Sequence, residues 1–406
     1  MNAVAAFCDY LGQTGDRHTH LYEVGDSPYP SLLDHSATFG EKYRIHVIDP
    51  FARRRPLLVN HDFLSASAGY PLQFTVTLVL DSQMASTLHA YRLGSEAMDC
   101  DRRRAVQGLL RFASSRGFDY NPLFYLIESF YRNDRAVFID KVAPVATSLL
   151  YLHSMDAEHF NKTEEIRLNP DALDYYFALY GQRTLEDCGA ACIERFLRDY
   201  QTYDMLQGLR VSYLCLLKMT LIHKRTRGHF EAKFDEYQRF IANELGCAVA
   251  YESLLATYYF ADLAGNFMSV QPGMELAKAK RALWSIAWDL MLLRIPEYLL
   301  TPRQLPRVNL GYACSADRYL AELGKLFTIM RMIVRSDSDE KVGPALAIDL
   351  TALEKKVGTA AVGTISDIAA RSWHSHRGFS YSQAWKHRIE AMLQDLEIQL
   401  ADLCRQ

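Results

Sequence analysis

The chain has 406 residues, of which 49% are hydrophobic and 23% are charged, and its formal net charge is -3. This composition is typical of a folded protein and excludes an extended disordered or fibrous chain. The slightly acidic balance also excludes a protein whose whole surface binds nucleic acid, although a local basic groove, for example at residues 102 to 104, is compatible with it.

Residues 1 to 70 form a mixed segment with many turn signals from glycine and proline. The run at residues 43 to 49 alternates and predicts a short strand. We expect an accessory N-terminal segment here, either a lobe of its own or a cover for the edge of a sheet.

Residues 72 to 81 predict a buried strand that runs into a helix. The run is rich in β-branched and aromatic side chains, and it ends in Asp81, which is followed by Ser82 and a helical pattern. Asp81 would therefore lie at the carboxyl end of a strand, and in open parallel sheets that edge is where ligands bind.

Two helices are expected between residues 102 and 133, separated by a break at residues 117 to 122. Pro122 suits the first turn of the second helix. Glu128 lies in this second helix among apolar residues, where an unpaired carboxylate would be costly to bury.

The chain from residue 135 to 283 is predicted to be helical throughout, with long amphipathic stretches and no strand pattern. We interpret residues 135 to 273 as an irregular helical bundle inserted into another domain. A helix from Met274 to about Leu293 follows, carries Asp289, and is expected to end in a loop that contains Pro296.

Residues 308 to 317 predict a short strand that ends in Asp317, so this acid repeats the placement of Asp81. After Leu320 the chain is expected to return to helices, including one at residues 386 to 403 with a single apolar face. Residues 336 to 406 would form a helical C-terminal region.

Hydrolysis of a phosphodiester by divalent ions needs several carboxylates at one spot. Mg²⁺ and Mn²⁺ prefer oxygen ligands, and two such ions can hold the attacking water and the leaving oxygen together. Sequence can show only that acids stand at strand ends or in apolar helices, where packing does not account for them. The acids that meet this description are Asp81, Glu128, Asp289 and Asp317.

The order and context of these four acids resemble the PIN family of nucleases. Domains of that family combine an Asp after the first strand, a helical Glu, an Asp in a later helix, and a Thr-x-Asp at the end of the next strand. Ser315 stands where the family usually has Thr, and Ser82 occupies a similar small polar position after Asp81. The resemblance implies that the four acids are catalytic and bind metal, and that Ser82 and Ser315 orient a ligand or water.

The resemblance covers residues 72 to 133 and 274 to 320, because the chain between Glu128 and Asp289 is far longer than in a compact PIN domain. It implies an α/β fold with a small, mostly parallel sheet flanked by helices. The PIN-like domain would be built from residues 71 to 134 and 274 to 335. The implied activity is metal-dependent hydrolysis by direct attack of water, with Mg²⁺ or Mn²⁺ as cofactor and RNA favoured over DNA as substrate.

A structural explanation competes with the catalytic one for each acid. Asp81 and Asp317 could cap helices, which Asp does well, and Glu128 could pair with Arg132 and Asp289 with Arg294 along their helices. The corresponding alternative function is a helical interaction or scaffold protein with a degenerate PIN-like core. The inserted helices would then contact a second copy or another protein.

Other classes of activity have no motif to support them. The sequence has no HExxH, no P-loop lysine motif and no Gly-x-Ser-x-Gly elbow. The cysteines are scattered without a CxxC pair and are expected to be free thiols. The N-terminus lacks the pattern of a secretory signal and the apolar runs are too short for a membrane span, so we expect a cytoplasmic protein without a membrane partner.

Overall fold

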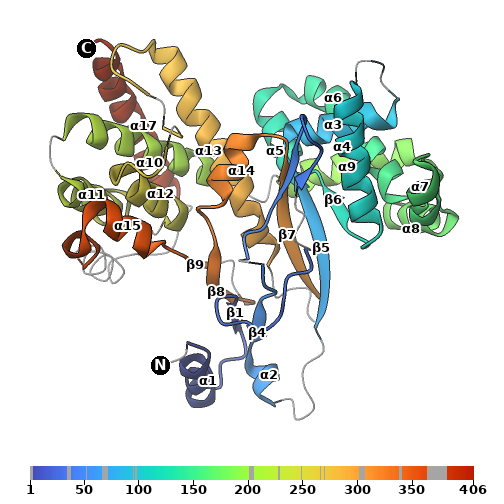
Figure 1. Cartoon of the computed structure of the whole chain (residues 1–406), viewed down its shortest axis with the longest axis horizontal. Helices are drawn as coiled ribbons and strands as arrows, with labels where there is room; N and C mark the ends of the chain where they lie inside the picture. Colours follow the sequence, from blue (N-terminus) through green and yellow to red (C-terminus); the bar gives the residue numbers. More distant parts are fainter. Residues whose placement is uncertain are drawn as a thin grey trace.

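The structure of the chain is a computed structural model that describes most of its residues (Figure 1). The described residues are 3–33, 38–51, 53–65, 72–94, 96, 98–200, 205–226, 229–247, 249–265, 267–268, 270–300, 307–337, 341–363 and 382–406. The fold is mixed α/β, with helices packed around two sheets. The α/β class is therefore confirmed, whereas the finer PIN-like arrangement stays a prediction.

The central sheet has the strand order β2-β3-β7-β5-β6. Its strands are β2 (Thr38–Phe39), β3 (Ile45–Ile48), β5 (Gln73–Leu80), β6 (Asp119–Asn121) and β7 (Arg307–Ser315). Strand β5 is parallel to both β6 and β7, while β3 pairs antiparallel with β7 and with β2. The strands predicted at 43–49, 72–81 and 308–317 are confirmed as β3, β5 and β7. The N-terminal segment thus extends the parallel part of the sheet on one edge.

A second, fully antiparallel sheet has the order β4-β1-β8-β9, and it corrects the expectation of one mostly parallel sheet. Its strands are β1 (Thr19–Glu23), β4 (Leu57–Val59), β8 (Ile329–Arg335) and β9 (Lys341–Leu346). The helix predicted at residues 386 to 403 is confirmed as part of α17 (Gln383–Cys404). The return to helices directly after Leu320 is wrong, because β8 and β9 follow, and β9 lies inside the region 336–406 that was expected to be helical. Strand β8 carries Arg331 and Arg335 among its apolar residues, and only part of the strand is buried, so its hydrophobic pattern is not continuous.

The helices form two groups on either side of the central sheet (Figure 1). Helix α6 packs against α3 and α9 in one group, while α10 packs against α13 and α17 in the other. The first group is α3 (Ser82–Arg92), α4 (Cys100–Ser114), α5 (Leu123–Arg132), α6 (Arg135–His153), α7 (Ala157–Thr163), α8 (Pro170–Tyr180) and α9 (Leu185–Tyr200). The second is α10 (Met205–Arg225), α11 (Phe230–Arg239), the π-helix η1 (Phe240–Leu245), α12 (Ala250–Phe260), α13 (Leu276–Leu299), α15 (Leu350–Val357) and α17 (Gln383–Cys404). Short helices complete the chain at α1 (Ala3–Thr14), α2 (His61–Ser65) and α14 (Arg318–Gly324).

The helical character predicted for residues 135 to 283 is confirmed in the described part of that range, which besides helices and irregular segments contains isolated β-bridge positions at Met155, Leu168 and Cys247. These helices belong to both groups rather than to one compact bundle. The domain boundaries drawn from the sequence stay a prediction.

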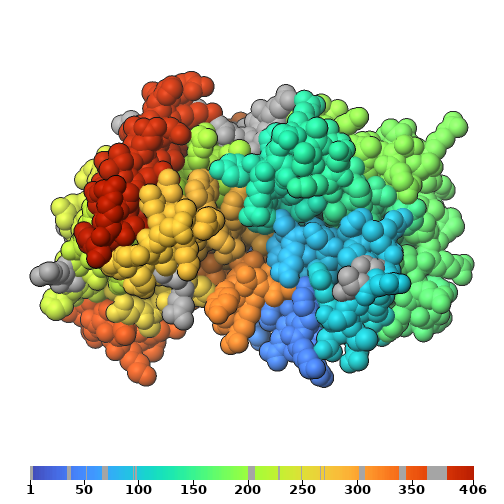
Figure 2. Space-filling model, turned by 90° about the horizontal axis from the view of Figure 1, so that it is seen from above, coloured from blue at the N-terminus to red at the C-terminus, as the bar shows by residue number. Residues whose placement is uncertain are grey.

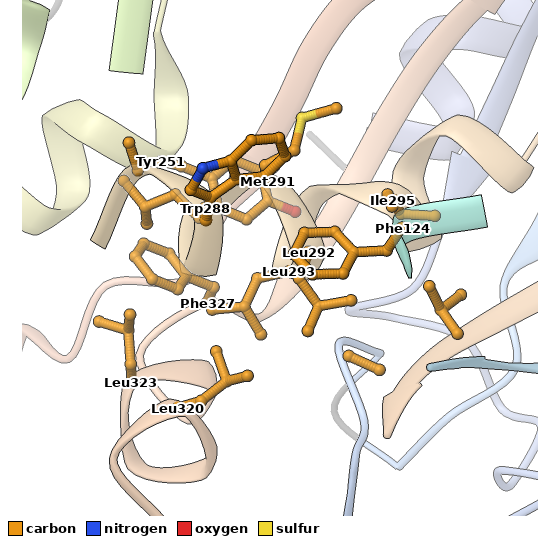
Figure 3. Close-up of a cluster of buried hydrophobic side chains, with 14 of the residues drawn as sticks. Phe124, Tyr251, Trp288, Met291, Leu292, Leu293, Ile295, Leu320, Leu323 and Phe327 are labelled. Atoms are coloured by element: carbon orange, nitrogen blue, oxygen red, sulfur yellow. The ribbon is translucent and has the colours of Figure 1, made fainter. Parts of the chain in front are cut away.

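Helix α13 crosses the centre of the molecule and is buried on nearly every side over its second half. Figure 3 shows its Trp288, Met291 and Leu292 among side chains from α5, α12 and α14. The predicted end near Leu293 is wrong, because the helix continues through Pro296 to Leu299. Proline usually ends a helix, but here dense packing holds the last turn in place. A Cβ atom on Gly311 of β7 would lie 2.9 Å from Pro296 Cα, so only glycine allows this approach.

A buried ion pair joins α12 to α13. Arg294 Nη2 donates to both carboxylate oxygens of Glu252, at 2.8 and 2.7 Å, and the hydroxyl of Ser212 on α10 donates to the same carboxylate. Glu252 is fully buried. The pairing of Arg294 with Asp289, considered from the sequence, is therefore wrong, since Arg294 is engaged elsewhere.

Among the described helices, α6 alone is long and apolar enough to cross a membrane. Half of the relevant window is buried inside the protein, where α6 packs against α3 and α9. This burial is the usual environment of a core helix. The cytoplasmic location stays a prediction.

Candidate active site

Asp81 lies where β5 passes into α3, beside the end of β7. Its backbone N–H donates to the carbonyl of Cys314 at 3.1 Å, which continues the β5–β7 pairing by one residue. Its side chain is almost completely buried and accepts from the backbone N–H of Met84 at 2.5 Å, so it caps α3. The capping expected as an alternative role of Asp81 is confirmed.

Ser315 connects Asp81 to Asp317. Its fully buried hydroxyl donates to Asp81 and accepts from the backbone N–H of Asp317 at 2.9 Å. Asp317 caps α14, because its Oδ1 accepts from the N–H groups of Tyr319 and Leu320 at 2.6 and 3.3 Å. The ends of the parallel strands β5 and β7 therefore present both acids at one edge of the sheet.

Glu128 reaches this edge from α5. The hydroxyl of Ser82 donates to one of its oxygens, and Arg132 Nη2 lies 2.5 Å from the other. The pairing with Arg132 expected as an alternative is confirmed. Ser82 and Ser315 thus each hold one carboxylate, although the sequence suggested that they would orient a ligand or water.

Asp289 comes from the middle of α13 and is partly buried. Among the described residues, no hydrogen bond or ion pair to its side chain is present. Its pKa is raised to about 7, first by burial and then by the negative charges of Asp317, Glu128 and Asp81. All these causes act in the same direction, because burial and nearby negative charges both disfavour the ionised carboxylate.

Asp81 shows the same crowding in weaker form. Burial raises its pKa to about 6, hydrogen bonds from Ser315 and Met84 oppose the rise, and the charges of Glu128 and Asp317 add to it. The structure therefore brings all four predicted acids close enough for their charges to interact. Figure 2 views the molecule from above, where the segments of α3, α5, α13 and α14 adjoin on one face.

The chemistry of these donors suits Mg²⁺ or Mn²⁺, which bind carboxylate oxygens. Both oxygens of Asp289 and Oδ2 of Asp317 accept no hydrogen bond from the described residues, whereas Glu128 is engaged by Ser82 and Arg132. The described residues contain no group of three Asp, Glu, His or Cys side chains arranged to hold one ion. Ion binding would therefore require the carboxylates to move closer together than they lie here.

The basic cluster at residues 102 to 104 does not form a groove at this site. Arg102 Nη2 donates to Thr87 at 2.5 Å and its guanidinium lies over the ring of Tyr43, while Arg104 approaches Asp101. These arginines are occupied in packing and surface pairing around α4. Any cation that serves a substrate phosphate must come from another segment.

A pocket of about 510 Å³ adjoins the acids between α3, α5 and α6. Ser82 and Glu128 lie in its wall, so it is continuous with the acidic site. Its lining residues are Ser82, Ser86, His89, Tyr125, Glu128, Ser129, Arg132, Asn133, Asp140, Lys141, Pro144 and Val145. Sequence reasoning singled out only those next to Asp81 and Glu128, because no local pattern shows that α6 closes over α3 and α5.

No model of a known protein family matches this chain, and neither a curated protein nor a solved structure shows significant similarity to it.

Proposed function

We propose that the chain is a metal-dependent nuclease that hydrolyses phosphodiester bonds, with Asp81, Glu128, Asp289 and Asp317 as the carboxylates that bind Mg²⁺ or Mn²⁺. The resemblance to the PIN family favours RNA over DNA as the substrate. A bound divalent ion would polarise the phosphate and lower the pKa of the attacking water. The residues of the chain would hold the ion and fix the positions of the carboxylates around it.

The position of Asp289 is the single observation that carries this proposal, because it lies near the other three carboxylates and no hydrogen bond or ion pair from the described residues reaches its side chain. The acid sits on a long core helix without a cation beside it among the described residues, and burial, together with the charges of three other carboxylates, raises its pKa to about 7. Like charges destabilise one another unless a proton or a cation offsets them. A divalent cation would provide that offset at neutral pH.

The hydroxyls of Ser82 and Ser315 support the proposal, because each donates to one acid. Such hydrogen bonds hold a ligand's orientation and are typical of the outer shell of a metal site. Water would attack the phosphorus directly, so no covalent intermediate on the protein is expected.

A non-catalytic helical scaffold is the second candidate, and the present partners of the acids favour it. Asp81 and Asp317 each cap a helix and Glu128 pairs with Arg132, so three of the acids already have a structural role. Asp289 has no such role among the described residues and therefore distinguishes the two candidates.

Titration with Mn²⁺ tests the proposal. Thermal melting of the parent should shift upward as Mn²⁺ is added, since a ligand that binds only the folded state stabilises it. Labelled single-stranded RNA should be cleaved only in the presence of the ion. In Asp289→Asn and Asp317→Asn both the Mn²⁺ shift and the cleavage should be lost, while the variants stay folded.

Asp99→Asn is the matched control. Asp99 is an exposed acid that caps α4 through the N–H of Arg102, as Asp317 caps α14, and Asn caps helices about as well as Asp. This variant should keep the Mn²⁺ shift and the cleavage. The nuclease proposal is excluded if millimolar Mn²⁺ does not change the melting temperature of the parent and the parent leaves RNA and DNA intact. The non-catalytic scaffold is then the remaining candidate.

A further inference from the structure

The pocket between α3, α5 and α6 is a candidate binding site in its own right. Its volume of about 510 Å³ lies in the range of pockets that hold small organic ligands. Helix α6 forms one wall, and this helix falls outside the segments for which the sequence resembles the PIN family. The resemblance to the PIN family therefore does not imply which ligand this pocket binds.

Two cations line the pocket and have donors to spare. Lys141 Nζ lies 2.7 Å from Oδ1 of Asn133, which uses one of its three N–H bonds. Arg132 carries five donors and contacts Glu128 through Nη2. Both side chains are exposed, so their remaining donors can meet an anionic group that enters from solvent.

The rest of the lining suits a sugar and a base. Tyr125 and Val145 contribute apolar surface, and Ser86 and Ser129 contribute hydroxyls. Pro144 has no N–H to donate to the carbonyl of Asp140 one helical turn earlier, so that carbonyl lacks its usual helical donor. The pocket thus offers cations, apolar surface and hydroxyls together.

We propose that this pocket binds one nucleotide of a single-stranded nucleic acid, next to the phosphodiester held at the acids, with its phosphate on Lys141 and Arg132. The inference rests on the proposed nuclease function, because Glu128 and Ser82 belong to both places. A duplex would have to flip a nucleotide out of its stack to fill the pocket, whereas a single strand presents one directly. Asp140 and Glu128 also line the pocket, and their negative charges partly offset the positive charges of Lys141 and Arg132. Binding would therefore depend on how well the nucleotide fits the pocket as well as on its charge.

Binding of a strand without metal tests the inference apart from catalysis. The parent background is Asp289→Asn, in EDTA, which prevents metal-dependent hydrolysis and removes one negative charge near the phosphate. Fluorescence anisotropy of a short labelled oligouridylate gives the affinity over a range of salt concentrations. Lys141→Ala should weaken binding roughly fivefold at 0.1 M salt and make the log–log salt dependence about 0.7 shallower, which is the effect of one lost phosphate contact on a single strand.

Lys162→Ala is the matched control, because Lys162 is an exposed lysine paired with Glu158 at 2.5 Å on α7, away from the pocket. It should leave both the affinity and the salt dependence unchanged, and Lys141→Arg should restore most of the lost affinity. A bulky residue at exposed Ser86, Ser86→Tyr, should also weaken binding by filling the pocket, without a change in salt dependence.

Several outcomes would overturn the inference. These are unchanged binding in both pocket variants, equal weakening by the Lys162 control, a duplex competitor as effective as the single strand, and uridine monophosphate binding as tightly as the strand. Failure of the nuclease proposal looks different, since it appears as the absence of a Mn²⁺ shift and of cleavage in the parent. The two results are therefore measured independently.

Discussion

Replacement of Asp289 by Asn should stabilise the protein in the absence of metal, and the gain should depend on pH. The pKa of Asp289 rises from 3.8 to about 7 in the folded chain, a difference of about three units. Each unit corresponds to about 1.4 kcal/mol, so the ionised carboxylate costs at most about 4 kcal/mol at pH 8. Asn has the same shape and carries no charge, so it removes this cost.

The sign follows from proton binding. Between pH 4 and pH 7 the folded chain holds a proton on Asp289 that the unfolded chain has released, so the free energy of unfolding of the parent falls as the pH rises through this range. Below pH 4 both states are protonated and the effect vanishes. The difference between variant and parent should therefore grow by about 3 kcal/mol from pH 5 to pH 8.

Urea denaturation in EDTA, followed by tryptophan fluorescence at both pH values, measures this difference. Asp99→Asn should show no comparable growth, because its carboxylate is exposed. A gain for Asp289→Asn that is equal at pH 5 and pH 8, or a loss of stability at pH 8, would refute the reasoning that burial and the neighbouring carboxylates raise the pKa of Asp289.

Three further substitutions test the packing around the site. Ser315→Ala should lower the free energy of unfolding by about 1 to 3 kcal/mol and raise the pKa of Asp81 further, because this buried acid loses its hydroxyl donor. Ser315→Thr keeps a hydroxyl and should recover much of the lost free energy, as measured by urea unfolding. Arg294→Met should cost about 3 to 5 kcal/mol by leaving the buried Glu252 unpaired, and the double change with Glu252→Gln should be markedly milder in the same assay. Gly311→Ala should lower the free energy of unfolding by about 1 to 3 kcal/mol, and with it the thermal midpoint, because the new Cβ would meet the backbone of α13. An unchanged midpoint would show that the helix can move away.

The sequence predicted those elements whose hydrophobic pattern is continuous. Strands β5 and β7 are buried along consecutive residues, which occurs when helices cover both faces of a sheet, and this pattern reads clearly. Strand β8 contains two arginines and is only partly buried, and β6 has three residues, so neither gives a comparable signal. The second sheet was missed for this reason.

The candidate site was predicted in part, because strand ends and acids in apolar helices are visible in sequence. Asp81 and Asp317 follow from strands β5 and β7, whereas the partners of the acids depend on which helices meet. Arg294 was a plausible partner of Asp289 by spacing, yet the fold turns it toward Glu252 on α12. The pocket at Lys141 could not be foreseen, since it exists only where α6 lies over α3 and α5.

The pairing of β5 with β7 has a consequence for the covalent chain. These strands are neighbours in the sheet although the helices from α3 to α13 lie between them in sequence. The ladder and the core, rather than the peptide bonds of the intervening chain, therefore keep Asp81 beside Ser315. A single backbone cut at the exposed turn where Glu164 ends α7 would leave one fragment with β5 and the other with β7. The two fragments should stay associated and keep the carboxylates together after cleavage, so the intact polypeptide is needed to assemble this site but not to maintain it.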